Sequence, residues 1–137
     1  MKLPGPDHPI TIEPSRRQMR GAFDKHVIAD TDDAVILREA DYPAVCYFPM
    51  DDVDMAFLQK TDHKTHCPYK GDASYWSIYM DGNLAENAVW GYEAPFESMS
   101  ALKGRLAFYP NVVDIYALDA HGEAVEADPK ITAPPIV

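Results

Sequence analysis

The chain has 137 residues, of which 47% are hydrophobic and 25% charged, and its formal net charge is −10. A chain of this length buries roughly two-thirds of its unfolded surface, so we expect a single domain over residues 1–137 with a core over residues 8–118. The acidic balance disfavours partners that require a basic face, namely nucleic acids and anionic membrane surfaces.

Cysteine usage sets an expectation about compartment. Cys46 and Cys67 are the two cysteines, and no C-x-x-C pair occurs, which argues against a disulfide scaffold and against a four-cysteine zinc site. The chain starts without a basic-then-apolar leader, and no apolar run reaches the length of a membrane span. We therefore expect a reduced, cytoplasmic protein.

Residues 1–20 are expected to form an N-terminal arm that lies across the body of the domain. Prolines and glycine are frequent in its first nine residues, and a short extended piece follows at residues 10–12. Arg16, Arg17 and Arg20 come next. They form either a patch that binds anions or, as is commoner before a strand, a solvated edge.

Short apolar and aromatic segments between turn residues predict a mainly β fold. The expected strands are 22–31, 34–39, 44–48, 61–67, 73–80, 87–93, 105–109 and 112–118. The first two are expected to pair as a hairpin across the aspartate-rich turn at residues 30–33. Two short helices are predicted at 51–58 and 95–102, and a loosely held tail at 126–137. The result is a compact rolled sheet or partly open barrel of about seven or eight short strands.

The stretch from Thr61 to Trp76 has the most unusual composition in the chain. It reads T-D-H-K-T-H-C-P-Y-K-G-D-A-S-Y-W, which predicts a polar strand, a tight turn at residues 68–71 and an aromatic strand. Within it, Gly71 permits a left-handed turn and close approach of a ligand, while Lys70 offers a point charge for a phosphate or carboxylate. The spacing of a P-loop is absent.

Metal and thiol chemistry are the alternatives for this stretch. His63, His66 and Cys67 are good zinc ligands, but adjacent residues on a strand point to opposite faces. Cationic neighbours such as His66 favour a reactive thiolate at Cys67, whereas a cysteine before Pro68 typically braces a turn. We expect neither a metal nor another cofactor.

Acidic residues near position 52 offer a second place for a cation. Asp51, Asp52 and Asp54 are hard ligands for a divalent ion. Carboxylates at the start of a helix explain them equally well.

Four aromatic residues on three predicted strands are candidates for a pocket wall. If Tyr47, Tyr75, Trp90 and Tyr92 share one face, they line a slot that stacks a planar ligand. The alternative is that they form ordinary core.

These segments resemble a known family. T-H-C-P-Y-K-G-D-A-S-Y-W (65–76), A-V-W-G-Y-E-A-P (88–95) and G-R-L-A-F-Y (104–109) are similar to domain-of-unknown-function family 427. V-C-Y-F-P-M-D-D-V (45–53) and H-P-I-T-I-E-P (8–14) also match its pattern. The resemblance implies a small β-rich domain with Mss4-like topology and a nucleotidyltransferase-like label. It supplies no established catalytic residues.

The leading hypothesis is a domain that binds a small, anionic and partly planar ligand in a cleft formed by lysine and aromatic residues. Its residues are Lys70, Gly71, Tyr75, Trp90, Tyr92, Tyr47, Cys67 and His66. A nucleotidyltransferase-like enzyme that uses the D-x-D spacing of Asp52 and Asp54 is the second hypothesis. The third is a protein-interaction module or homodimer built on the aromatic surface and an edge strand.

Overall fold

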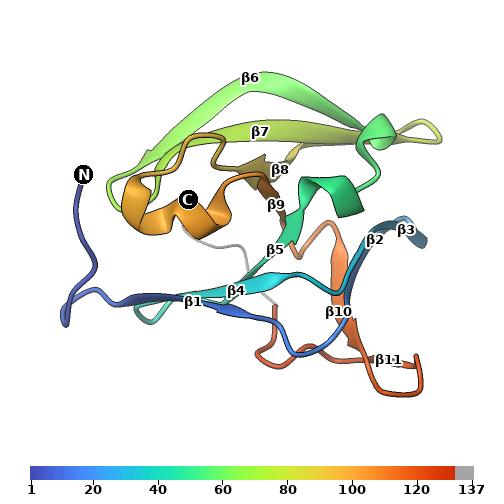
Figure 1. Ribbon diagram of the computed structural model, residues 1–137. Helices are drawn as coiled ribbons and strands as arrows, with labels where there is room; N and C mark the ends of the chain where they lie inside the picture. The colour runs from blue at the N-terminus through green and yellow to red at the C-terminus, as the bar shows by residue number, and fades with distance from the viewer. Residues whose placement is uncertain (132–137) are drawn as a thin grey trace.

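The structure, a computed structural model that describes residues 1–131, contains two antiparallel sheets and three short 3-10 helices (Figure 1). The larger sheet has the order β1-β4-β5-β9-β8-β7-β6, and its strands are Ile10–Pro14, Val35–Glu39, Val45–Pro49, Arg105–Phe108, Asn83–Gly91, Gly71–Met80 and Leu58–Cys67. The smaller sheet has the order β11-β10-β2-β3, and its strands are Ala124–Val125, Asp114–Leu118, Met19–Phe23 and His26–Thr31. The prediction of a mainly β fold with few helices is confirmed, and neither sheet closes into a barrel.

The segment 22–31 differs from its prediction. It contains parts of two strands, β2 and β3, which pair with each other across a turn at Asp24 and Lys25. Both turn residues have positive φ, 49° and 68°, as the tight turns of β-hairpins require. The expected hairpin between this segment and residues 34–39 is therefore wrong, because β4 pairs with β1 and β5 in the other sheet. Because of this split and the additional strands β1 and β11, the structure has 11 strands among residues 1–131, against the expected seven or eight.

The first predicted helix is interrupted. Residues 51–58 contain two separate 3-10 turns, η1 (Met50–Asp52) and η2 (Met55–Phe57). Between them Val53 is extended, with φ −111° and ψ 139°, and forms a bridge with Ala29 of β3. Val53 is also buried, so packing against the small sheet overrides the helical pattern. The second predicted helix appears as η3 (Glu97–Leu102).

The larger sheet is rolled, as Figure 1 shows: β6, β7 and β8 form an upper layer, β1 and β4 a lower one, and β5 and β9 connect them. One hydrophobic cluster fills the inside of the roll beneath η3, and it includes Tyr47, Trp90 and Leu102. The other cluster includes Phe48 and Trp76 and reaches residues of the smaller sheet. Successive side chains of a strand point to opposite faces, so the same central strands supply both clusters.

The two ends of the described chain pack against the body. Residues of β1 pair with β4, and the amide of Ala40 donates to the carbonyl of Pro9 at 2.8 Å. In the tail expected at 126–137, Ala127 and Ile131 are buried in the cluster that includes Phe48 and Trp76, and residues 132–137 lie outside the described part. Within residues 1–131 the structure has no helix with the length and apolar character needed to cross a membrane.

Candidate functional site

The predicted strand–turn–strand at residues 61–76 is confirmed. β6 and β7 pair up to Cys67 and Gly71, which face each other at the turn. Gly71 has φ +113°, a conformation that side chains disfavour. A Cβ there would meet its nearest atoms, in residues 94–96, at 3.5–3.6 Å, which is ordinary contact. Backbone conformation, rather than lack of room, therefore requires glycine at this position.

Lys70 lies in the interior of the protein. Its Nζ donates a hydrogen bond to Oε1 of Glu39, and the two side chains are 3% and 7% exposed. Glu39 ends β4, and its other oxygen, Oε2, lies 2.8 Å from Nε2 of His8. A ligand anion would have to displace Glu39 from Lys70, which is costly for a buried pair. Anion binding by Lys70 stays a prediction, and this geometry weighs against it.

The N-terminal arm covers the turn through His8. The His8 ring stacks on Tyr69 with centroids 4.2 Å apart and an interplanar angle of 6°. The amide of Lys2 donates to the carbonyl of Pro68 at 2.7 Å. Nothing in the local sequence relates Glu39 and His8 to this turn, because each of the two contacts of Glu39 joins residues 31 positions apart along the chain.

The four aromatic candidates do come together, but inside the protein. Tyr47, Tyr75, Trp90 and Tyr92 are each at most 2% exposed and share the inner cluster with Cys67. The Trp90 ring meets Tyr47 edge-on at 6.3 Å. They therefore form core inside the roll, and the expected open slot is not visible at these side chains.

Two hydroxyl groups of this cluster differ in their partners. Tyr75 Oη lies 2.9 Å from Oγ1 of Thr65, whereas Tyr92 Oη is buried without a hydrogen-bond partner among residues 1–131. Burial raises the pKa of Tyr92, and the same cause raises the pKa of Tyr47. Both phenols therefore stay neutral at physiological pH.

The histidines and the thiol of β6 do not converge. Cys67 is 8% exposed and free, while His66 is exposed and its Nδ1 lies 2.7 Å from Oδ1 of Asp72. His63 packs its ring edge-on against Tyr75 at 4.4 Å. In the described part of the chain, no three His, Cys, Asp or Glu side chains are arranged to share a metal ion.

Asp52, the first aspartate of the D-x-D spacing, makes a structural contact. Oδ2 of Asp52 accepts a hydrogen bond from Oγ1 of Thr31 at 2.7 Å. The nucleotidyltransferase hypothesis gains no observation from this contact.

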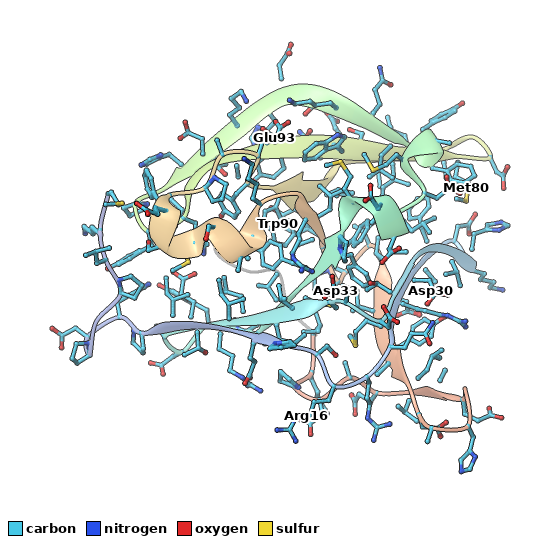
Figure 2. The ribbon with its side chains drawn as sticks, in the orientation of Figure 1. Arg16, Asp30, Asp33, Met80, Trp90 and Glu93 are labelled. Atoms are coloured by element: carbon cyan, nitrogen blue, oxygen red, sulfur yellow. The ribbon has the colours of Figure 1, made fainter. Side chains whose placement is uncertain are left out.

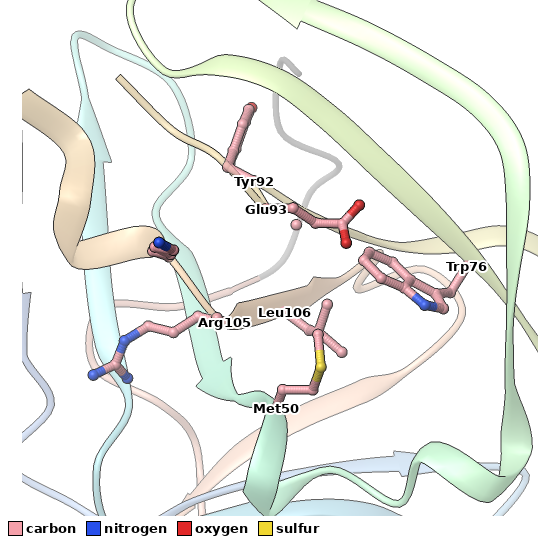
Figure 3. A pocket seen from close by; sticks show the side chains of 9 residues that line it. Met50, Trp76, Tyr92, Glu93, Arg105 and Leu106 are labelled. Carbon is pink, nitrogen blue, oxygen red and sulfur yellow. The ribbon is translucent and has the colours of Figure 1, made fainter. Parts of the chain in front are cut away.

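A pocket of about 180 Å³ opens on the other side of β8, and we call it the Trp76 pocket (Figure 3). It is lined by Met50, Trp76, Gly91, Tyr92, Glu93, Lys103, Gly104, Arg105 and Leu106. Gly91 has no room for a side chain, because a Cβ there would lie 2.6 Å from the carbonyl oxygen of Arg105. Of the residues predicted from the sequence, only Tyr92 lines this pocket.

Charged groups surround the Trp76 pocket. Lys60 Nζ lies 2.6 Å from Oε1 of Glu93 and 5.9 Å from the centroid of the Trp76 ring. The hydrogen bond from Lys60 lowers the pKa of Glu93 most, and the hydrogen bond from Ser74 lowers it further. This carboxylate is therefore ionised at neutral pH. Lys103 is exposed and has no carboxylate within 4.0 Å in the described chain. The guanidinium of Arg105 points away from the pocket and bonds to Asp33 (Figure 3).

Sequence reasoning missed this pocket because its charged residues were not singled out, although Gly91, Glu93 and Arg105 lie in the family-like segments. Comparison with curated proteins found no match. A family model labelled NTP_transf_9 and described as a domain of unknown function (DUF427) matches residues 11–119. That match covers most of the 137 residues, so the chain belongs to the DUF427 family.

Proposed function

We propose that the protein binds a small, anionic and partly planar ligand, and that the Trp76 pocket is the binding site. The observation that carries the proposal is the combination of an indole wall with ammonium groups beside it. The Trp76 ring lines the pocket with the 5% of the residue that is exposed, and an indole suits a planar group. Lys103, which has no carboxylate within 4.0 Å among residues 1–131, supplies the positive charge for an anion, and Lys60 lies beside the Trp76 ring in an ion pair with Glu93.

Glu93 adds a selective element. Its carboxylate is ionised, so it accepts hydrogen bonds and donates none. Lys60 and Ser74 both bond to its Oε1. A ligand with an N–H or O–H group next to its ring therefore suits the pocket better than one with acceptors alone.

The size of the pocket limits the ligand. Its volume of about 180 Å³ is below the range of roughly 300–1,000 Å³ typical for drug-sized ligands. The ligand part that enters is therefore a single ring or a group of similar size, and larger portions extend over Lys103 into solvent.

The family-like segments also support this location. Apart from Lys103, all residues that line the Trp76 pocket fall within the segments 45–53, 65–76, 88–95 and 104–109. These segments are far apart in the sequence, and the rolled sheet brings them together around one opening.

A thermal-shift screen with nucleotides, sugar phosphates and aromatic carboxylates tests the proposal. A ligand at 100 times its Kd raises the free energy of unfolding by about 2.7 kcal/mol. Lys103→Gln removes one charge-assisted contact and is expected to weaken binding about tenfold. Lys25→Gln is the matched control, since it changes the net charge equally at a turn far along the chain from the pocket residues.

Two outcomes oppose the proposal. One is that no ligand class produces a saturable shift of the wild-type protein. The other is that Lys103→Gln and Lys25→Gln bind the best ligand equally well. A loss of binding in the double variant Glu39→Leu/Lys70→Met, which keeps no buried unpaired charge, with no effect of Lys103→Gln, would instead assign the ligand to the turn at residues 68–71.

A further inference from the structure

A second cavity, of about 370 Å³, lies where the two sheets meet. Ile36 and Arg38 reach it from β4, Met19 from β2 and Ala117 from β10. The connection between β1 and β2 contributes Arg16 and Arg17. Figure 2 shows Arg16 projecting from this connection on the lower side of the molecule. We call this cavity the arginine pocket.

The arginine pocket has an apolar floor and a charged rim. Met19, Ile36 and Ala117 are at most 5% exposed, so they form a floor that belongs to the core. Arg16 and Arg17 are exposed. Apolar surface below and a few convergent charges above are typical of binding sites for small molecules.

The charges of the arginine pocket leave an excess of positive charge. Nε of Arg38 pairs with Oε1 of Glu13 at 3.1 Å. Arg16 and Arg17 have no carboxylate within 4.0 Å among residues 1–131. Asp128 is the second carboxylate at the rim, so three guanidinium groups face two acidic groups. This local excess is notable in a chain with a net charge of −10.

We propose that the arginine pocket binds a molecule with an oxyanion group and a small apolar portion. Guanidinium groups match oxyanions because their planar forks donate two parallel hydrogen bonds to phosphate or carboxylate. Arg16 and Arg17 contact the oxyanion, and the apolar portion rests on Met19 and Ile36. The volume of about 370 Å³ lies within the range of roughly 300–1,000 Å³ found for ligand sites.

This site is independent of the Trp76 pocket. The two pockets share no lining residue. Failure of one proposal therefore leaves the other intact, because the variants that test them are different.

The test is an NMR titration of the full chain with inorganic phosphate and, separately, with succinate. Ionic strength is held constant with chloride, so that general screening does not change during the titration. We expect saturable shifts of backbone amides at residues 15–19, 36–38 and 117 with at least one of the two anions. The anion with the tighter midpoint identifies the oxyanion class.

Matched variants assign the binding to the two arginines. Arg16→Gln and Arg17→Gln are each expected to weaken the midpoint about tenfold, as one charge-assisted contact is lost. Lys25→Gln, which changes the charge equally on the β2–β3 turn, is expected to leave the midpoint unchanged. Non-saturating shifts with both anions would overturn the proposal, and so would equal midpoints in the three variants.

Discussion

Lys70 was predicted to bind an anionic ligand, but in the structure it forms an ion pair within the fold. Its ammonium group is buried and bonds to Glu39, which also bonds to His8 of the N-terminal arm. Two groups of opposite charge in a dry interior satisfy each other, but the loss of either leaves a charge without compensation. The three residues link the arm, the end of β4 and the turn before β7.

At the residue scale, Lys70→Met is expected to lower the free energy of unfolding by about 3–5 kcal/mol, because Glu39 keeps a buried charge without its partner. The double variant Glu39→Leu/Lys70→Met replaces the whole pair by apolar groups. It is expected to recover most of the loss, since such replacements are often neutral or stabilising. Urea denaturation of the wild type, Lys70→Met, Glu39→Leu and the double variant measures this coupling. Strictly additive effects of the single variants would show that the pair does not act as a unit.

At the scale of elements, β8 separates two environments. Trp90 belongs to the inner cluster, while the next residue, Gly91, lines the Trp76 pocket. A Cβ on Gly91 would lie 2.6 Å from the carbonyl oxygen of Arg105 and 3.0 Å from a methyl carbon of Leu106. The first contact is with backbone, which cannot rotate away. Close approach of β8 and β9 therefore depends on glycine here.

Gly91→Ala is expected to cost about 1–3 kcal/mol of unfolding free energy, as overpacking of a tight interior does. It should also reduce ligand affinity at the Trp76 pocket, because β9 must shift. Gly5→Ala is the control, since a Cβ at Gly5 meets no atom within 4 Å. We expect the control to change stability by less than about 1 kcal/mol. Equal stability of the two variants in urea denaturation would contradict the close approach.

At the scale of the whole molecule, the central strands connect the two clusters. β5, β7, β8 and β9 each contribute residues to both. If these strands unfold, the side chains of both clusters become exposed to solvent. We therefore propose that both sheets unfold together as one domain.

The two tryptophans report on the two clusters separately, with Trp76 in one and Trp90 in the other. Trp76→Phe and Trp90→Phe each leave a single fluorophore. Within each variant, the urea midpoint from fluorescence is expected to agree with that from circular dichroism, as in a two-state transition. Midpoints that differ within one variant would indicate that the clusters unfold independently.

The sequence by itself determined the local structure of much of this protein. Short apolar and aromatic segments indicated the strands around residues 45–48 and 75–80, and the turn at 68–71 followed from Pro68 and Gly71. These features depend on neighbours along the chain, so a local pattern is sufficient to find them. The grouping of Tyr47, Tyr75, Trp90 and Tyr92 was a hypothesis from the sequence, with ordinary core as its alternative, and the structure buries the four together in one cluster.

Only the tertiary structure decided which strands pair and what the candidate residues contact. β3 pairs with β2 and not, as predicted, with residues 34–39. The chain turns between β2 and β3 because Asp24 and Lys25 adopt positive φ, and the identity of these two residues does not predict that conformation. The partner of Lys70 is Glu39, 31 residues away, and nothing in the local pattern relates the two. Rolling of the sheet buries the aromatic face and opens the Trp76 pocket on the other side. The burial of Lys70 with Glu39 and the burial of the aromatic rings both depend on packing between distant parts of the chain. The alternation of residues along one strand does not predict such packing.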